Sequence, residues 1–137
     1  MKIGYTTGVF DMFHIGHLNI LRRAKEHCDY LIVGVSTDDL VREYKHKQPV
    51  VPYKERAEIV AAIRYVDEVV PQTDRDKVAA QERLGFHIMF VGDDWKGSEL
   101  FTQVEREFAK RGVEVMYFPY TKGTSSTLLS EKLSKLE

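Results

Sequence analysis

The sequence predicts a single-domain α/β fold, a Rossmann-like, doubly wound parallel sheet of about five strands with helices on both faces. Short apolar runs rich in β-branched residues alternate with helical patterns along the 137 residues of the chain. Near-continuous apolar runs such as 31–35 suit strands of a parallel sheet that is covered on both faces. Gly85 and Gly112 stand where helix C-caps belong. Right-handed crossovers between such units produce the doubly wound arrangement.

The expected elements alternate in chain order, with no repeat, low-complexity tract or linker between them. Runs rich in β-branched and aromatic residues predict strands at 2–7, 30–36, 68–70, 88–91 and 114–118. Apolar residues that recur every three or four positions predict helices at 15–27, 37–44, 53–65, 74–84, 98–110 and 125–136. In the expected helix 53–65, for example, Ile59, Val60 and Ile63 form the apolar face. Residues 1–137 are therefore interpreted as one domain.

The composition is that of an ordinary soluble globular protein, with 43% hydrophobic and 30% charged residues. The net charge of −1 provides no general attraction to nucleic acid or to an anionic membrane. No apolar run approaches the roughly 18 residues that span a bilayer, and the N-terminus has no signal-peptide pattern. The single cysteine, Cys28, excludes an internal disulfide and is interpreted as a small buried hydrophobe. We therefore expect a cytoplasmic protein without nucleic-acid or membrane partners.

Segment 8–17, Gly-Val-Phe-Asp-Met-Phe-His-Ile-Gly-His, joins the first expected strand to the first expected helix. His14 and His17 are three positions apart and so lie on one face of the first helical turn. Gly16 between them leaves space for a close ligand, and the N-terminus of a helix favours an anion. The segment predicts a phosphate site with imidazole donors beside it.

Three other interpretations of this histidine pair are open. With Asp11 as a third ligand the pair could hold a metal ion, although no further His/Cys cluster supports this. The histidines could be structural, as caps or core residues. The segment could also belong to a nucleotide-binding module that performs no catalysis.

Three more polar segments lie beyond the ends of expected strands. Lys45-His46-Lys47 lies in a proline-flanked loop that could close over a triphosphate or be a solvated charge run. Segment 92–95, Gly-Asp-Asp-Trp, could contact the edge of a base, or its acids could cap the next helix. Segment 121–127, Thr-Lys-Gly-Thr-Ser-Ser-Thr, could cradle an anion or be a plain Ser/Thr N-cap. Ligands bind at the carboxyl ends of the strands in such sheets, so this convergence indicates a functional site.

Together these segments resemble the glycerol-3-phosphate cytidylyltransferase-like family of the HxGH nucleotidylyltransferases, over residues 3 to about 132. The resemblance implies transfer of CMP from CTP to a phosphorylated small alcohol, glycerol 3-phosphate in the first place, which gives a CDP-alcohol and pyrophosphate. It also implies Mg²⁺ carried mainly on the triphosphate, a homodimer, and a product that serves as a precursor of a cell-envelope polysaccharide or teichoic acid.

The resemblance also assigns roles to individual residues. The catalytic residues are expected to be His14, His17 and Lys47. Asp11 is expected to contact the Mg²⁺, and the acceptor is expected to meet Lys45, Arg64 and Lys77. The nucleotide is expected to contact a larger set, namely Gly8, Val9, Phe10, Asp11, His14, Ile15, Gly16, His17, Lys47, Gly92, Asp93, Asp94, Trp95, Tyr120, Thr121, Lys122, Gly123, Thr124, Ser125, Ser126 and Thr127.

The chain departs from the family pattern in two places. Tyr120 stands where the family has a phosphate-binding arginine, and Lys122 could supply the missing charge. The family usually carries a tryptophan near the position of Arg75 and a lysine a few residues later, close to Lys77. The resemblance implies that this region shapes the acceptor pocket, so other polyol phosphates, phosphocholine-like compounds and phosphorylated amino-acid derivatives stay open as acceptors.

Other functional classes also stay open. The same scaffold can transfer AMP to FMN, nicotinamide mononucleotide or phosphopantetheine, a metal-dependent hydrolase could use His14, His17 and Asp11, and a regulatory module could bind CTP without turnover.

Overall fold

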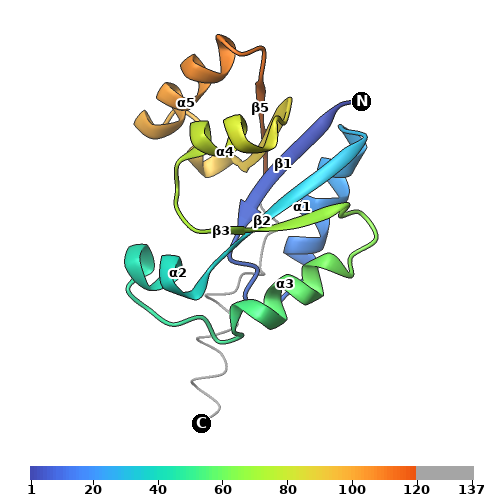
Figure 1. Cartoon of the computed structure of the whole chain (residues 1–137), viewed down its shortest axis with the longest axis vertical. Helices are drawn as coiled ribbons and strands as arrows, with labels where there is room; N and C mark the ends of the chain where they lie inside the picture. Colours follow the sequence, from blue (N-terminus) through green and yellow to red (C-terminus); the bar gives the residue numbers. More distant parts are fainter. Residues whose placement is uncertain (120–137) are drawn as a thin grey trace.

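The fold is built around one sheet of five parallel strands (Figure 1). A computed structural model describes residues 1–119, and the expected helix 125–136 lies outside this range. The order across the sheet is β3-β2-β1-β4-β5, and each neighbouring pair is parallel. The strands are β1 (Ile3–Gly8), β2 (Tyr30–Ser36), β3 (Glu68–Gln72), β4 (Ile88–Gly92) and β5 (Glu114–Phe118). The expected Rossmann-like sheet is confirmed.

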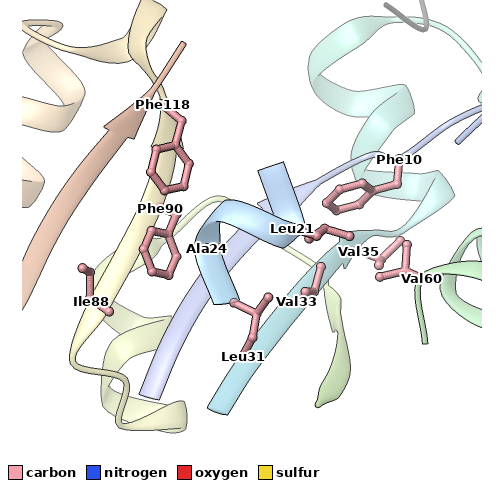
Figure 2. Packing of buried hydrophobic residues seen from close by; sticks show 10 residues of the cluster. All are labelled: Phe10, Leu21, Ala24, Leu31, Val33, Val35, Val60, Ile88, Phe90 and Phe118. Carbon is pink, nitrogen blue, oxygen red and sulfur yellow. The ribbon is translucent and has the colours of Figure 1, made fainter. Parts of the chain in front are cut away.

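Helices cover both faces of this sheet. On one face, Leu21 and Ala24 of α1 and Val60 of α3 pack against β2, β4 and β5, and Figure 2 shows these side chains converging. On the other face, Ala80 of α4 and Phe108 of α5 pack against β1, β2 and β4. The helices are α1 (Ile15–Glu26), α2 (Asp38–Lys45), α3 (Tyr53–Ala61), α4 (Lys77–Leu84) and α5 (Glu99–Ala109), with a 3₁₀ turn η1 (Asp93–Trp95) after β4.

The order of the strands creates a switch point between β1 and β4. From β1 the chain first extends the sheet through β2 and β3, and then returns to the other side of β1 with β4 and β5. The hydroxyl of Thr6 in β1 donates to the carbonyl of Phe90 in β4 at 3.0 Å. The loops that leave the carboxyl ends of β1 and β4 therefore diverge around a crevice, which is where such sheets bind ligands.

Two expected helices are shorter than the sequence pattern suggests. The helix expected over 53–65 ends at Ala61, since the following residues turn tightly, with the amide of Val66 donating to the carbonyl of Ile63. The helix expected over 74–84 begins at Lys77, because the side chain of Asp76 accepts the amide of Ala79 as an N-cap.

The third strand is longer than expected. It was expected over 68–70 and runs to Gln72 through Pro71. Proline lacks an amide donor, but β3 is the edge strand of the sheet, so this position needs no partner on its outer side. Gly85 is the left-handed C-cap of α4, with φ of +69°, as predicted. Gly112, with φ of +70°, lies beyond the C-cap of α5, which is Lys110.

The helices of residues 1–119 are too short or too polar to cross a bilayer.

Candidate active site

A cleft of about 280 Å³ opens at the carboxyl ends of the strands. The last residue of every strand lines it, and so do His17 of α1 and Trp95 of η1. The strand-end residues are Gly8, Ser36, Gln72, Gly92 and Phe118. The strand ends therefore meet at one site, as the sequence predicted for the segments after β1, β2 and β4.

The loop between β1 and α1 is held in an unusual backbone conformation. Phe10 and Met12 have φ of +54° and +49°, in the left-handed region that residues other than glycine rarely adopt. The ring of Phe10 is buried in the core cluster that α1 covers. A Cβ on Gly8 would lie 2.9 Å from that ring, so this position requires glycine. Core packing thus fixes the loop that carries the two histidines.

His14 and His17 cap α1 reciprocally. Nδ1 of His14, the N-cap residue, accepts the amide of Gly16 at 3.0 Å, and Nδ1 of His17 accepts the amide of His14 at 3.2 Å. This is the geometry of a capping box, with imidazoles in place of the usual hydroxyl and carboxylate. The rings stack with centroids 3.9 Å apart. The structural and functional interpretations of the pair are therefore compatible, because each ring uses only one of its nitrogens as a cap.

The capping bonds also determine which nitrogen carries the proton. A neutral imidazole that accepts a hydrogen bond at Nδ1 holds its proton on Nε2. Burial lowers the pKa of His14. Burial, reinforced by His14 and opposed by Asp11, lowers the pKa of His17 to about 4. Both rings are neutral at pH 7 and carry their proton on Nε2. Nε2 of His14 is buried and has no hydrogen-bond partner within residues 1–119, and His14 is not among the residues that line the cleft, whereas His17 is.

This electrostatic environment predicts an unusual titration. The ring protons of His17, identified in an NMR spectrum by their loss in His17→Gln, should titrate with a midpoint near pH 4. Between about pH 6.5 and pH 4, His17 is protonated in the unfolded chain but stays neutral in the folded protein. The free energy of unfolding should therefore fall as the pH drops from 6.5 to 4. His17→Gln should lose this part of the pH dependence. A midpoint near 6.5 would contradict the buried neutral state.

Asp11 ties the loop after α2 to the histidine loop. Its two carboxylate oxygens accept the amides of Val50 and Val51 at 2.8 and 2.9 Å. A second hollow of about 230 Å³ lies between these two loops, and it is lined by Asp11, His17 and Lys47. The carboxylate thus holds the loop after α2, which carries Lys47 and is called the lysine loop below, next to His17.

Arg56 is a buried residue that was not among the expected site residues. It is only 1% exposed, and its guanidinium donates to the carbonyls of Val9, Ser36 and Val51 and to the carboxylate of Asp38, all at 2.7–2.8 Å. Burial alone would raise the pKa of Asp38, but the Arg56 hydrogen bond and a backbone amide lower it. One side chain therefore joins the histidine loop, the end of β2 and the start of α3.

Three cations line the cleft, and none of its described lining residues is acidic. They are Lys45 at the end of α2, Arg75 in the loop after β3, and Lys77 at the start of α4. Burial lowers the pKa of Lys45, and neighbouring cations, Arg75 among them, lower it further. Burial, together with Arg75, lowers the pKa of Lys77 to about 8. The cleft is therefore suited to an anionic ligand.

The other expected site residues are distributed as follows. Lys47 lines the second hollow. Asp93 and Asp94 are exposed in η1 and do not line the cleft. Arg64 lies beyond α3, is exposed and donates to the hydroxyl of Tyr65, so this chain alone does not bring it to either hollow. The expected nucleotide contacts at 120–127 lie outside the described residues.

The donor set bears on how a metal ion would be held. Residues 1–119 contain no group of three or more His, Cys, Asp or Glu side chains placed to hold a metal. Asp11 already accepts two amides, and each histidine has one nitrogen engaged. These residues fit Mg²⁺ that arrives on substrate phosphates, since Mg²⁺ keeps waters and binds through few carboxylates.

The chain is similar to known proteins over most of its length. The chain is 39% identical to the glycerol-3-phosphate cytidylyltransferase of Bacillus subtilis, over 99% of this chain and 100% of that protein. It is also 39% identical to the FAD synthase of Thermococcus kodakarensis, over 82% of this chain and 76% of that protein. A solved structure described as a lipopolysaccharide core biosynthesis protein from Thermoplasma volcanium superposes with a TM-score of 0.74 at 26% identity. That match covers 90% of this chain and 99% of the other.

A cytidylyltransferase-like family model matches residues 5–132. This range includes the HxGH loop, the lysine loop, η1 and the expected segment at 121–127. Because this match covers most of the chain and a curated relative agrees with it, the chain belongs to the cytidylyltransferase-like family.

Proposed function

We propose that the protein transfers CMP from CTP to glycerol 3-phosphate, which gives CDP-glycerol and pyrophosphate. The observation that carries this proposal is the pair of neutral imidazoles, whose Nδ1 atoms cap α1 and leave Nε2–H as the donor. The glycerol-3-phosphate cytidylyltransferase of B. subtilis, similar over the whole length, supports the choice of both substrates.

The reaction is an in-line displacement at the α-phosphorus of CTP. An oxygen of the acceptor phosphate forms the new bond while the bond to the bridging oxygen of pyrophosphate breaks, and pyrophosphate leaves with the electron pair. The attacking oxygen is already anionic, so no side chain has to remove a proton. Nε2–H of His14 and of His17 donate to oxygens on which negative charge grows, and these preorganised donors stabilise the transition state.

The cations divide the remaining tasks. Lys47, on the loop held by Asp11, neutralises CTP phosphates next to His17. Lys45 and Lys77, on the cleft side, attract the phosphate of the acceptor. Mg²⁺ bound to the triphosphate adds charge neutralisation on the leaving group. In this proposal the enzyme is a cytoplasmic homodimer, and its product feeds a cell-envelope polysaccharide or teichoic acid.

The test is pyrophosphate release from CTP with Mg²⁺ across a panel of phosphorylated alcohols. Turnover with glycerol 3-phosphate is the expected result. Turnover only with another acceptor would support cytidylyl transfer but contradict glycerol 3-phosphate as the acceptor. No pyrophosphate release from CTP with any acceptor would overturn the proposed function.

Adenylyl transfer is the second candidate, because the FAD synthase of T. kodakarensis matches this chain at the same identity. The same assay with ATP and FMN decides between the two. Turnover of ATP with FMN that exceeds turnover of CTP with glycerol 3-phosphate would favour this candidate.

Lys47→Ala is expected to raise KM for CTP about tenfold or more, because a charged contact with phosphate is lost. Lys54→Ala is the matched control, since Lys54 is an exposed lysine on α3 that lines neither hollow. The readout is steady-state pyrophosphate release at varied CTP. Unchanged KM and kcat for CTP in Lys47→Ala would contradict the role of the lysine loop.

A further inference from the structure

The cleft contains an arginine, Arg75, whose guanidinium lies close to two aromatic rings. The Cζ atom of Arg75 lies 4.7 Å from the ring centroid of Tyr44 on α2 and 5.9 Å from that of Trp95 in η1. All three side chains line the cleft. Arg75 comes from the loop after β3, so its guanidinium lies close to rings contributed by two other parts of the chain.

The neighbouring carboxylates of Asp74 and Asp76 do not pair with the guanidinium of Arg75. Asp74 accepts the amide of Asp76, and Asp76 accepts the amide of Ala79 at the start of α4. Within residues 1–119 no ion pair involves Arg75. A guanidinium stacked on a ring keeps its N–H edge available, and that planar fork matches two oxygens of a phosphate.

The same aromatic pair has a second consequence. Tyrosine and tryptophan rings around an open position bind quaternary ammonium groups. Here the position over the rings already holds a cation, Arg75, and Lys45 and Lys77 add positive charge in the same cleft. A ligand with its own positive group meets repulsion there, whereas a ligand whose only charges are negative is attracted.

We propose that Arg75 determines the acceptor: its guanidinium binds the phosphate of an acceptor with an uncharged polyol chain and excludes zwitterionic acceptors such as phosphocholine. This inference rests on the proposed function, which it deepens.

Trp95 provides a binding readout that does not need turnover, because it is the only tryptophan of the chain. Its fluorescence is followed while glycerol 3-phosphate or phosphocholine is added to the wild type, Arg75→Gln, Arg75→Lys and Arg106→Gln. Arg106→Gln is the matched control, since it removes one exposed arginine from α5 outside the cleft. KM and kcat for CTP and for each acceptor are measured on the same proteins.

In Arg75→Gln we expect Kd and KM for glycerol 3-phosphate to rise roughly tenfold to 100-fold, while KM for CTP stays within about twofold. The ratio of kcat/KM for glycerol 3-phosphate to kcat/KM for phosphocholine should fall by a similar factor. Arg75→Lys should recover part of the loss, because it restores the charge without the planar fork. Arg106→Gln should behave as the wild type.

The inference is overturned if Arg75→Gln binds glycerol 3-phosphate as tightly as the wild type does. It is also overturned if the wild type accepts phosphocholine equally well or binds no glycerol 3-phosphate. If the wild type binds glycerol 3-phosphate but releases no pyrophosphate, the proposed function fails. The binding titrations of the variants still decide the role of Arg75 in that case.

Discussion

Replacing His17 with alanine is expected to lower kcat about 10²- to 10³-fold, the usual cost of removing one preorganised transition-state donor. The physical reason is that Nε2–H of a neutral imidazole donates to an oxygen on which charge grows during the displacement. KM for CTP should change far less, because the contact strengthens only as the charge develops. The measurement is steady-state pyrophosphate release at saturating CTP and acceptor.

Two further variants separate a chemical role of His17 from a structural one. His17→Gln should recover part of the lost rate, because a glutamine amide can place an N–H donor near the position of Nε2. His87→Ala is the histidine control, since His87 lies at the opposite end of the sheet, where its Nδ1 accepts the amide of Ile3. A loss below tenfold in His17→Ala, with the circular dichroism spectrum unchanged, would remove His17 from the catalytic role.

Replacing Arg56 with leucine is expected to lower the free energy of unfolding by about 3–5 kcal/mol. The substitution leaves the carbonyls of Val9, Ser36 and Val51 without their donor and the carboxylate of Asp38 without its cation. Buried polar groups that lose their partner cost far more than exposed ones. The measurement is equilibrium unfolding in urea at pH 7.5.

The matched control for Arg56 is Arg111→Leu. Arg111 pairs with Glu82 at 2.9 Å on the surface, where an ion pair contributes only about 0–1 kcal/mol. If Arg56→Leu cost no more than Arg111→Leu, the buried network would not hold the site together. If the network does hold it, residual folded Arg56→Leu protein should also show a lower kcat, because Arg56 fixes the backbone of the histidine loop at Val9.

The sequence indicated the location of the candidate site most directly in the segments that follow strands. Glycine and histidine at fixed spacing after β1 indicate a helix N-terminus open to an anion, and this signal is local. The sequence did not reveal that His14 and His17 cap the helix through their Nδ1 atoms, or that His17 lines the cleft while His14 does not. The placement of the two histidines depends on the strained loop between β1 and α1, which the buried ring of Phe10 holds in place.

Arg56 shows what a local pattern hides and what signal was present. It precedes Val60 by one helical turn and so lies on the apolar face of α3, a position that suggests burial with partners. Its partners come from β2, the histidine loop and the lysine loop, which are distant in the sequence. Periodicity could therefore indicate that Arg56 is buried, but not which groups it binds.

The sequence by itself determined the α/β class, the parallel sheet and the order of the elements in residues 1–119, because these follow from the hydrophobic periodicity of neighbouring residues. Only the tertiary structure decided which charges share a cleft, that Arg75 lies against Tyr44 and Trp95, and that Arg56 is buried. The physical reason is that pKa values, burial and cation–π contacts depend on which distant segments pack together, and that follows from the strand order and not from local spacing.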